Sequence, residues 1–321
     1  MDLSILLVVL IAPVIDMVFG ELPSKIHPVV LMGKFIDCSK NFKNKYPRLD
    51  SRLYGAASTL LIIFLFTGMF TLAIYLTKFN DIIFILVSSL LLSTTFAVKV
   101  LMDSAEKMKK YVDEDLDAAR MSVSYLVSRD TSGLSVEEVV SATIETLTEN
   151  ITDSVVSPLF YAFIFGVGGA AAYRVVNTMD AMIGYKDPET VKIGWFPAKL
   201  DDVVNYIPAR LTGVLVTLAA LLLRFDWRNA FAVMVRDARK TPSPNSGYPM
   251  AAAAGALGVK LKKIGCYELG DDLKPLDSNK ITEALLLTKI TLLLFLLLSA
   301  ATFLIVFTLF FQLFGVKFSL V

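Results

Sequence analysis

Four blocks of this sequence are long and apolar enough to cross a lipid bilayer as helices. A crossing takes roughly 20 mostly apolar residues, and the blocks lie at 3–19, 54–77, 82–98 and 284–315. Hydrophobic residues make up 55% of the chain, whereas a soluble domain typically has about 45–50%. Because strand-like alternation is scarce, we expect an all-α, polytopic integral membrane protein, built as a helical bundle with cytoplasmic polar loops and helices.

Two further apolar segments are close to the lower length limit for a span. The segment 155–172 is rich in Gly and Ala, and 208–223 is short and contains Arg210. They fit a spanning helical hairpin, re-entrant segments, or helices buried within the bundle. We favour non-spanning or re-entrant forms, because a single site needs all of the acids described below on one side.

The polar regions between these blocks carry the candidate catalytic groups, within a single domain of residues 1–321. These regions are 20–53, 99–153, 173–207 and 225–283. Lys and Arg number seven in 20–53, one in the turn 78–81 and six in 99–153. Since basic residues are enriched in cytoplasmic loops, we expect a multi-pass protein of the cell membrane whose active site faces the cytoplasm.

Composition argues against several classes of site. The net charge of +1 gives no global field that would favour nucleic acid. Cys38 and Cys266 are far apart with no CxxC, so metal or redox spacing is absent. The single histidine, His27, argues against a multi-histidine metal site, and against a Ser-His-Asp hydrolase unless His27 is the base. His27 itself is either structural or an acid–base group.

Three acids form a stripe on one predicted helix. Ser135 and Glu138 make a capping box that would start this helix. Glu145, Glu149 and Asp153 then follow at i, i+4 and i+8, which places them on one face. Like charges at this spacing repel. The stripe is either a solvated acidic face or a site for Mg²⁺, which takes oxygen ligands and often bridges to phosphates.

Two more sets of acids and amides follow the stripe. Asn177 and Asp180 are three positions apart, and Asp201, Asp202 and Asn205 form the second set. Each set can present two oxygens from one helix face. Together with the stripe they indicate a phosphate-handling centre with a hard cation. The metal ligands expected for it are Glu145, Glu149, Asp153, Asp201 and Asp202.

Arginines and one loop accompany the acids. Arg129 precedes the acidic helix, and Arg174 and Arg210 lie next to apolar segments. An arginine fork suits phosphate or carboxylate, although Arg174 and Arg210 are equally well interpreted as interfacial anchors. The loop 243–248 runs into an Ala-rich helix whose N-terminus could receive an anion. An ordinary capped turn is the alternative, and no Walker A motif is present.

At these residues the sequence resembles the CbiB/CobD family of cobalamin-biosynthesis membrane proteins, the adenosylcobinamide-phosphate synthases. The segments that carry the resemblance include Gly-Glu-Leu-Pro, Ser-Arg-Asp-Thr and Ser-Pro-Asn-Ser-Gly-Tyr, and their order and spacing agree along nearly the whole chain. They lie at 20–23, 27–29, 128–131, 145–153, 158–161, 173–180, 184–185, 201–210 and 243–248. One departure is Glu21, where the family commonly has Asp.

The resemblance implies an amide-forming reaction. Family members attach (R)-1-amino-2-propanol, or its O-phosphate, to the free propionate of (adenosyl)cobyric acid, which gives (adenosyl)cobinamide or its phosphate. The resemblance also implies that ATP and Mg²⁺ are needed. The expected partners are therefore the corrinoid, the amine and the lipid bilayer. Association with other membrane enzymes of the corrinoid pathway is a further expectation. Nucleic acid is not expected as a partner.

This chemistry assigns roles to the candidate residues. A carboxylate acylates an amine only after its oxygen becomes a leaving group, and phosphorylation achieves this. The hypothesis places Mg-nucleotide on Glu145, Glu149 and Asp153, with Asp180 or Asp202. A remaining acid or His27 would take the proton from the amine. The expected phosphate- or substrate-binding residues are Arg129, Asn150, Arg174, Asn177, Asn205, Arg210, Ser243, Asn245 and Ser246.

Two other functions fit the acids. One is a Mg²⁺-dependent membrane transferase acting on a lipid or prenyl diphosphate, which nucleotide use with a corrinoid would distinguish. The other is a non-catalytic transporter or membrane sensor with intramembrane acids. Transporters often contain inverted repeats, and none is found in this sequence.

Overall fold

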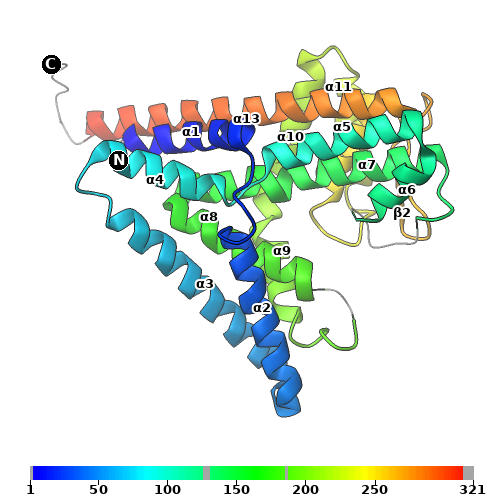
Figure 1. Ribbon diagram of the computed structural model, residues 1–321. Coiled ribbons are helices and arrows are strands. Elements are labelled where there is room, and N and C mark those ends of the chain that lie inside the picture. The colour runs from blue at the N-terminus through cyan, green and yellow to red at the C-terminus, as the bar shows by residue number, and fades with distance from the viewer. Residues whose placement is uncertain (1–2, 126–130, 185–186, 314–321) are drawn as a thin grey trace.

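The computed structural model describes residues 3–125, 131–184 and 187–313, and most of them are helical. The predicted all-α class is confirmed (Figure 1). The helices are α1 (Leu3–Phe19), α2 (Pro28–Lys45), α3 (Arg52–Tyr75), α4 (Asp81–Ser93), α5 (Val98–Glu114), α6 (Leu116–Ser124), α7 (Val136–Ile151), α8 (Ser157–Ile183), α9 (Trp195–Val204), α10 (Tyr206–Leu222), α11 (Trp227–Asp237), α12 (Gly247–Leu257) and α13 (Ser278–Leu313). Strands β1 (Leu261–Lys263) and β2 (Tyr267–Leu269) form one antiparallel hairpin.

By length and composition, four helical segments of the described chain could cross a membrane. They are Arg52–Tyr75, Asp81–Glu114, Val136–Ile183 and Ser278–Leu309, and the bent pair α9–α10 would be a fifth. The chain is therefore a multi-pass membrane protein. In Figure 1, α13 runs along one edge with α1 and α5 beside it, while α2 points away from this layer.

The predicted block 82–98 contains a helix break. Helix α4 ends at Ser93, and α5 begins at Val98. Asp16 of α1 accounts for the new start, because its Oδ2 accepts a 2.9 Å hydrogen bond from the Lys99 N–H. Ala97, the N-cap residue of α5, supplies no side-chain cap. The buried acid from α1 thus satisfies a free N–H group at a helix N-terminus, where a negative charge is stabilised.

Helix α8 reverses direction at Gly166. This glycine has φ 70° and ψ −171°, a conformation outside the helical region that glycine adopts without a steric penalty. The rings of Tyr161 and Tyr173 stack with centroids 5.5 Å apart, whereas twelve positions of straight helix span about 18 Å. Residues 157–165 and 167–183 are therefore the two arms of a helical hairpin. The reversal lies within the apolar segment 155–172.

The segment that follows α8 lies against the region around α2. Lys43 Nζ donates a 2.7 Å hydrogen bond to the Glu189 carbonyl. Lys192 forms a 2.8 Å ion pair with Asp50. Because the hairpin returns the chain and these contacts hold it there, residues 187–192 lie on the same side of the protein as the region 20–53.

Thiol labelling tests this arrangement. Two variants are compared, each with one reactive cysteine. The first carries Cys38→Ser, Cys266→Ser and Glu189→Cys, and the second carries Cys266→Ser alone and keeps native Cys38. We expect a membrane-impermeant maleimide to label both cysteines from the same side of the membrane. Both positions are exposed to solvent in the structure. The positive-inside prediction adds that this side is the cytoplasm. Labelling of the two positions from opposite sides would contradict the hairpin.

A compact ion cluster holds the β-hairpin region against α11. Asp237 is fully buried, and its carboxylate pairs with Arg236 at 2.8 Å and Lys240 at 2.6 Å. It also accepts a hydrogen bond from the Gly270 N–H at 2.9 Å. Burial alone would raise the pKa of Asp237, but the hydrogen bonds from Arg236, Lys240 and Gly270 outweigh it and lower the pKa to about 2.

Asp237→Asn should therefore destabilise the folded protein at neutral pH. A carboxyl whose pKa falls from 3.8 to about 2 on folding contributes roughly 2 kcal/mol to the free energy of unfolding. This stability is present above pH 4 or so and is lost as pH falls through the folded pKa. Thermal melting in detergent at pH 7 and at about pH 3 measures the effect, and the difference between wild type and variant should shrink at the lower pH. A constant difference would contradict the charged cluster.

Candidate functional site

The acidic helix begins as predicted and ends in an unexpected distortion. Ser135 and Glu138 form the predicted capping box at the start of α7. After Ile151 the chain forms one π-helical segment, Thr152–Val156, which contains Asp153. Such segments inside helices occur frequently at functional sites. Asp153, the third acid of the predicted i, i+4, i+8 stripe, therefore lies in a segment with a different helical period from α7.

Asn205, at the bend between α9 and α10, ties three segments together. The two helices meet at 44°. Asn205 Oδ1 accepts hydrogen bonds from Ser157 Oγ at 2.6 Å and from Tyr173 Oη at 2.9 Å. Its Nδ2 donates to Asp201 Oδ2 at 3.0 Å. A buried side chain with all of these bonds made is rigid, so Asn205 fixes both arms of the α8 hairpin against α9.

This framework brings the predicted acids together. The charge of Asp153 interacts electrostatically with those of Glu149, Asp180 and Asp201. Asp180 in turn interacts with Asp202. Acids of three separate segments therefore lie within electrostatic range of one another, and we call Glu149, Asp153, Asp180, Asp201 and Asp202 the acidic centre.

Within the described residues, the acidic centre has three carboxylates without a partner. Glu149, Asp153 and Asp180 are half-buried, and their side chains take part in no hydrogen bond or ion pair there. Asp201 is held by the amides of Asn177 and Asn205, and Asp202 pairs with Lys199 at 2.8 Å. Half-buried like charges without partners are costly. A cation or a cationic complex would relieve that cost.

Glu145 makes side-chain hydrogen bonds, unlike Glu149 and Asp153 on the same predicted stripe. It is buried, and its two carboxylate oxygens accept 2.7 Å hydrogen bonds from Ser141 Oγ and Tyr267 Oη. Ser141 Oγ also accepts a hydrogen bond from the Lys262 N–H. These contacts dock the β1–β2 hairpin on α7. The geometry therefore favours a positioning role for Glu145 over the predicted metal-ligand role.

The docked hairpin brings a cation that sequence reasoning missed. Lys263, the last residue of β1, is half-buried and interacts electrostatically with Glu149. The hydrogen bonds that place it there join residues 121 and 122 positions apart. No local pattern in the sequence signals such contacts.

Arg174 is a half-buried cation without a counter-ion among the described residues. Its Nη1 donates to Asn177 Oδ1 at 3.2 Å, while its Nε is buried and has no hydrogen-bond partner. It makes no ion pair among the described residues, although its charge interacts with those of Glu21 and Asp153 over a longer distance. An unsatisfied guanidinium beside the acidic centre suits an incoming phosphate or carboxylate. The interfacial-anchor interpretation does not explain the buried Nε.

Arg210 contacts the 243–248 loop directly. The Arg210 guanidinium lies between the rings of Tyr206 and Tyr248, 3.5 and 4.2 Å from their centroids. It donates to Asn245 Oδ1 at 2.7 Å and to the Pro244 carbonyl at 3.1 Å. Asn245 Nδ2 donates to the Asp202 carbonyl at 2.8 Å. Arg210 and Asn245 thus hold the backbone of Asp202 in place.

The loop before α12 forms a turn held by a side chain, although Ser246, the N-cap residue of α12, makes no side-chain capping bond. Ser243 Oγ accepts hydrogen bonds from the N–H groups of Asn245 and Ser246. Both of these N–H groups precede the first residue of α12, Gly247. The Ser246 side chain is half-buried and makes no hydrogen bond in the described part of the chain.

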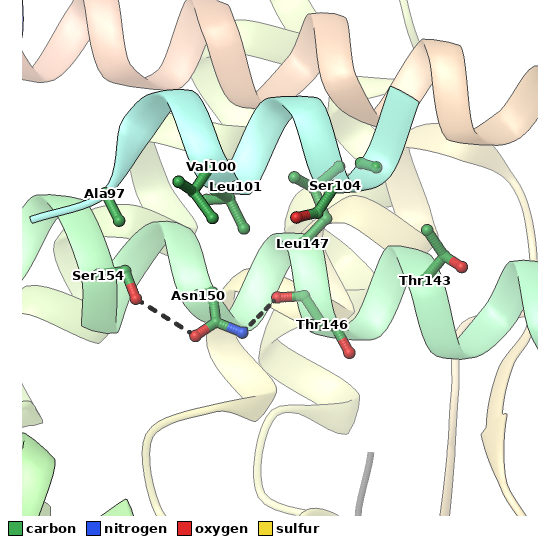
Figure 2. Close-up of a pocket in the computed structure, with 10 residues that line it drawn as sticks. Ala97, Val100, Leu101, Ser104, Thr143, Thr146, Leu147, Asn150 and Ser154 are labelled. Carbon is green, nitrogen blue, oxygen red and sulfur yellow. Dashed lines mark hydrogen bonds between the residues drawn. The ribbon is translucent and has the colours of Figure 1, made fainter. Parts of the chain in front are cut away.

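Two predicted residues lie apart from the acidic centre, and one cannot be placed. Asn150 donates to the Thr146 carbonyl at 2.9 Å and lines a separate cavity of about 190 Å³ between α5 and α7, which Figure 2 shows. His27 is the N-cap residue of α2, and its Nδ1 accepts a hydrogen bond from the Val29 N–H. Arg129 lies outside the described residues.

The oxygen donors of the acidic centre are of the kind that Mg²⁺ prefers, but they do not form a complete set of ligands. Among the described residues, no group of three or more His, Cys, Asp or Glu side chains is arranged to hold a metal ion. Mg²⁺ is usually held by one or two carboxylates together with waters and substrate phosphates. The free carboxylates of Glu149, Asp153 and Asp180 match that mode of binding.

Comparison with known proteins gives matches along most of the chain. Residues 9–293 match the family described as CobD/Cbib protein. The chain is 48% identical over 300 residues to the probable cobalamin biosynthesis protein CobD of Methanothermobacter thermautotrophicus, a match that covers 93% of this chain and 98% of the relative. It is 42% identical over 287 residues to the cobalamin biosynthesis protein CobD of Dehalococcoides mccartyi, covering 89% and 93%. No solved structure matches.

Proposed function

Because this chain belongs to the CobD/CbiB family of cobalamin biosynthesis proteins, we propose that it is an amide-bond-forming ligase acting on a corrinoid. Its substrates would be (adenosyl)cobyric acid and (R)-1-amino-2-propanol or the O-phosphate of that amine. ATP would activate the free propionate of the corrin. The product would be (adenosyl)cobinamide or its phosphate.

One observation carries this proposal: half-buried carboxylates without partners lie within electrostatic range of an arginine that has no counter-ion among the described residues. Glu149, Asp153 and Asp180 would receive a nucleotide together with its metal ion, and Arg174 would receive an anion. Discontinuous helices with polar groups at the break are a common way to build a site at membrane depth. The carboxylates without partners are better suited to a charged co-substrate than to a purely structural role.

In the proposed reaction, the chain's own residues position the reacting groups. Arg174 holds the propionate oxygens and stabilises the charge that develops on the phosphoryl group. Asn177 and Asn205 hold Asp201, and Arg210 with Asn245 holds Asp202, so the acids are pre-organised. When bound by Glu149, Asp153 and Asp180, Mg²⁺ would supply charge neutralisation at the phosphates. The activated carboxyl, an acyl phosphate, would then be open to attack by the amine.

Oxygen tracing in nanodiscs tests the proposal. Cobyric acid labelled with ¹⁸O in its free propionate is incubated with the protein, the amine, ATP and MgCl₂. We expect a product heavier than the labelled acid by the mass of the amine minus that of H₂¹⁸O, with one labelled oxygen transferred to inorganic phosphate. Product formation without ATP, or label that remains entirely in the amide and in water, would contradict carboxylate activation. Turnover of a prenyl diphosphate instead would support the transferase alternative.

A further inference from the structure

Another cavity is lined by none of the residues of the acidic centre and contains Glu21, whose charge interacts with that of Arg174. It has a volume of about 500 Å³ and lies between α1, the loop that follows α1, and α4. One wall is apolar and includes Ile15 and Leu90, and the other end carries Glu21 and His27. The cavity therefore combines a carboxylate with an apolar surface, which suits a small cation that has an aliphatic part.

Glu21 is the free charge in this cavity. Its side chain is exposed and makes no hydrogen bond or ion pair with any described residue. Its charge interacts electrostatically with both His27 and Arg174. Arg174 in turn interacts with Asp153 of the acidic centre. Arg174 thus interacts electrostatically both with Glu21 and with an acid of the acidic centre.

His27 is arranged as a hydrogen-bond donor. Its Nδ1 accepts the Val29 N–H at 3.2 Å, so in the neutral ring the hydrogen is on Nε2. Burial lowers the pKa of His27, and of the two nearby charges Glu21 raises it while Arg174 lowers it. A neutral ring in this tautomer has no free lone pair with which to take a proton. The base for an incoming amine must therefore be another group.

We propose that the polar end of this cavity binds the primary ammonium group of the amine substrate, and that Glu21 is the base that deprotonates it. The proposal rests on the proposed function and assigns the second substrate its own site. His27 Nε2–H would donate to the hydroxyl or phosphate oxygen of the amine. The apolar wall would accept the methyl group.

The ammonium group gives one proton to Glu21 and becomes a neutral amine. Its nitrogen forms a bond to the acyl carbon of the activated propionate, and the bond from that carbon to the phosphate oxygen breaks. The second proton of the nitrogen leaves with inorganic phosphate, and Glu21 returns its proton to solvent. Arg174 stays beside the acyl oxygen throughout.

Glu21→Gln separates the amine site from the activation site. Hydroxylamine is uncharged at neutral pH and traps activated carboxyl groups as hydroxamates without needing a base. We expect Glu21→Gln to lower kcat/KM for aminopropanol about 100-fold or more, while ATP-dependent hydroxamate formation stays within about threefold of wild type. Glu21→Asp should recover part of the activity. Glu137→Gln, at an exposed acid of α7, is the matched control.

The outcomes of this experiment are distinguishable. Equal losses with both nucleophiles, or no loss with either, would overturn the amine site. Absence of hydroxamate with the wild-type protein would instead contradict the proposed function. His27→Asn keeps an N-cap side chain and should lose less activity than Glu21→Gln, whereas a larger loss would make His27 the base.

A lipid headgroup is the other source of a primary ammonium. In phosphatidylcholine nanodiscs, adding phosphatidylethanolamine should leave the KM for aminopropanol unchanged. A KM that rises with the content of that lipid would show that the headgroup occupies the cavity, and would overturn the assignment to the substrate amine.

Discussion

Asp153→Asn is expected to abolish ATP-dependent amide formation, with a loss of about a thousandfold or more. Asp153 is at the centre of the acid interactions and has no partner among the described residues. Removing its charge removes a ligand for the metal-bound phosphates, and groups that act on phosphoryl transfer are worth losses on this scale. The measurement is product formation in nanodiscs, and we expect a comparable loss for Glu149→Gln.

Thermal stability provides an independent measure for the same variant. Because Asp153→Asn removes an unpaired, half-buried charge, the metal-free variant should melt at the same temperature as wild type or higher. Mg²⁺ with a nucleotide should raise the melting temperature of wild type but not of the variant. Asp103→Asn, at an exposed acid of α5, should change neither activity nor melting. Normal turnover in both Asp153→Asn and Glu149→Gln would refute the assignment.

Arg174→Ala should have the second largest effect, again about a thousandfold in kcat. The Nε of Arg174 is buried without a partner, which we interpret as the place of a substrate anion. Arg174→Lys keeps the charge but loses the planar fork, and should lose about 100-fold. Guanidinium added to the Arg174→Ala variant should recover part of its activity, because a small cation can enter the space left by the side chain.

A structural role for Arg174 would give a different pattern. If Arg174 is only an interfacial anchor, Arg174→Lys should retain activity within about twofold of wild type, and guanidinium should have no effect. Arg228→Lys on α11 is the control, since that exposed arginine contacts only the neighbouring Trp227 ring in the described structure. Its activity should be that of wild type.

The parts of the fold that could be predicted are those set by local composition. The apolar blocks gave the positions of α1, α3 and α13, and the spacing of Ser135 and Glu138 located the start of α7. The polar region 20–53 was expected as a connection, but it contains α2 and the N-terminus of α3. An amphipathic helix beside a membrane domain has no long apolar run, so hydropathy alone does not reveal it.

The candidate site was predictable in its acids but not in its geometry. Spacing identified Glu149, Asp153, Asp180 and Asp202, because acids at helical intervals next to apolar segments are unusual. Spacing could not show that Glu145 accepts a hydrogen bond from Tyr267 or that Arg210 lies between two tyrosine rings. Nor could it show that the chain reverses at Gly166. Those features depend on contacts between distant segments and on one backbone conformation.

Metal-directed cleavage tests the convergence of these acids most directly. Fe²⁺ replaces Mg²⁺ in the nanodisc-embedded protein with ATP, and ascorbate with peroxide then cuts the backbone close to the bound ion. We expect ATP-dependent cuts near residues 149–153, 180 and 201–202 together, all of them lost in Asp153→Asn. Cuts confined to one of these segments, or a pattern that does not change with ATP or with Asp153→Asn, would contradict a single phosphate centre shared by the three.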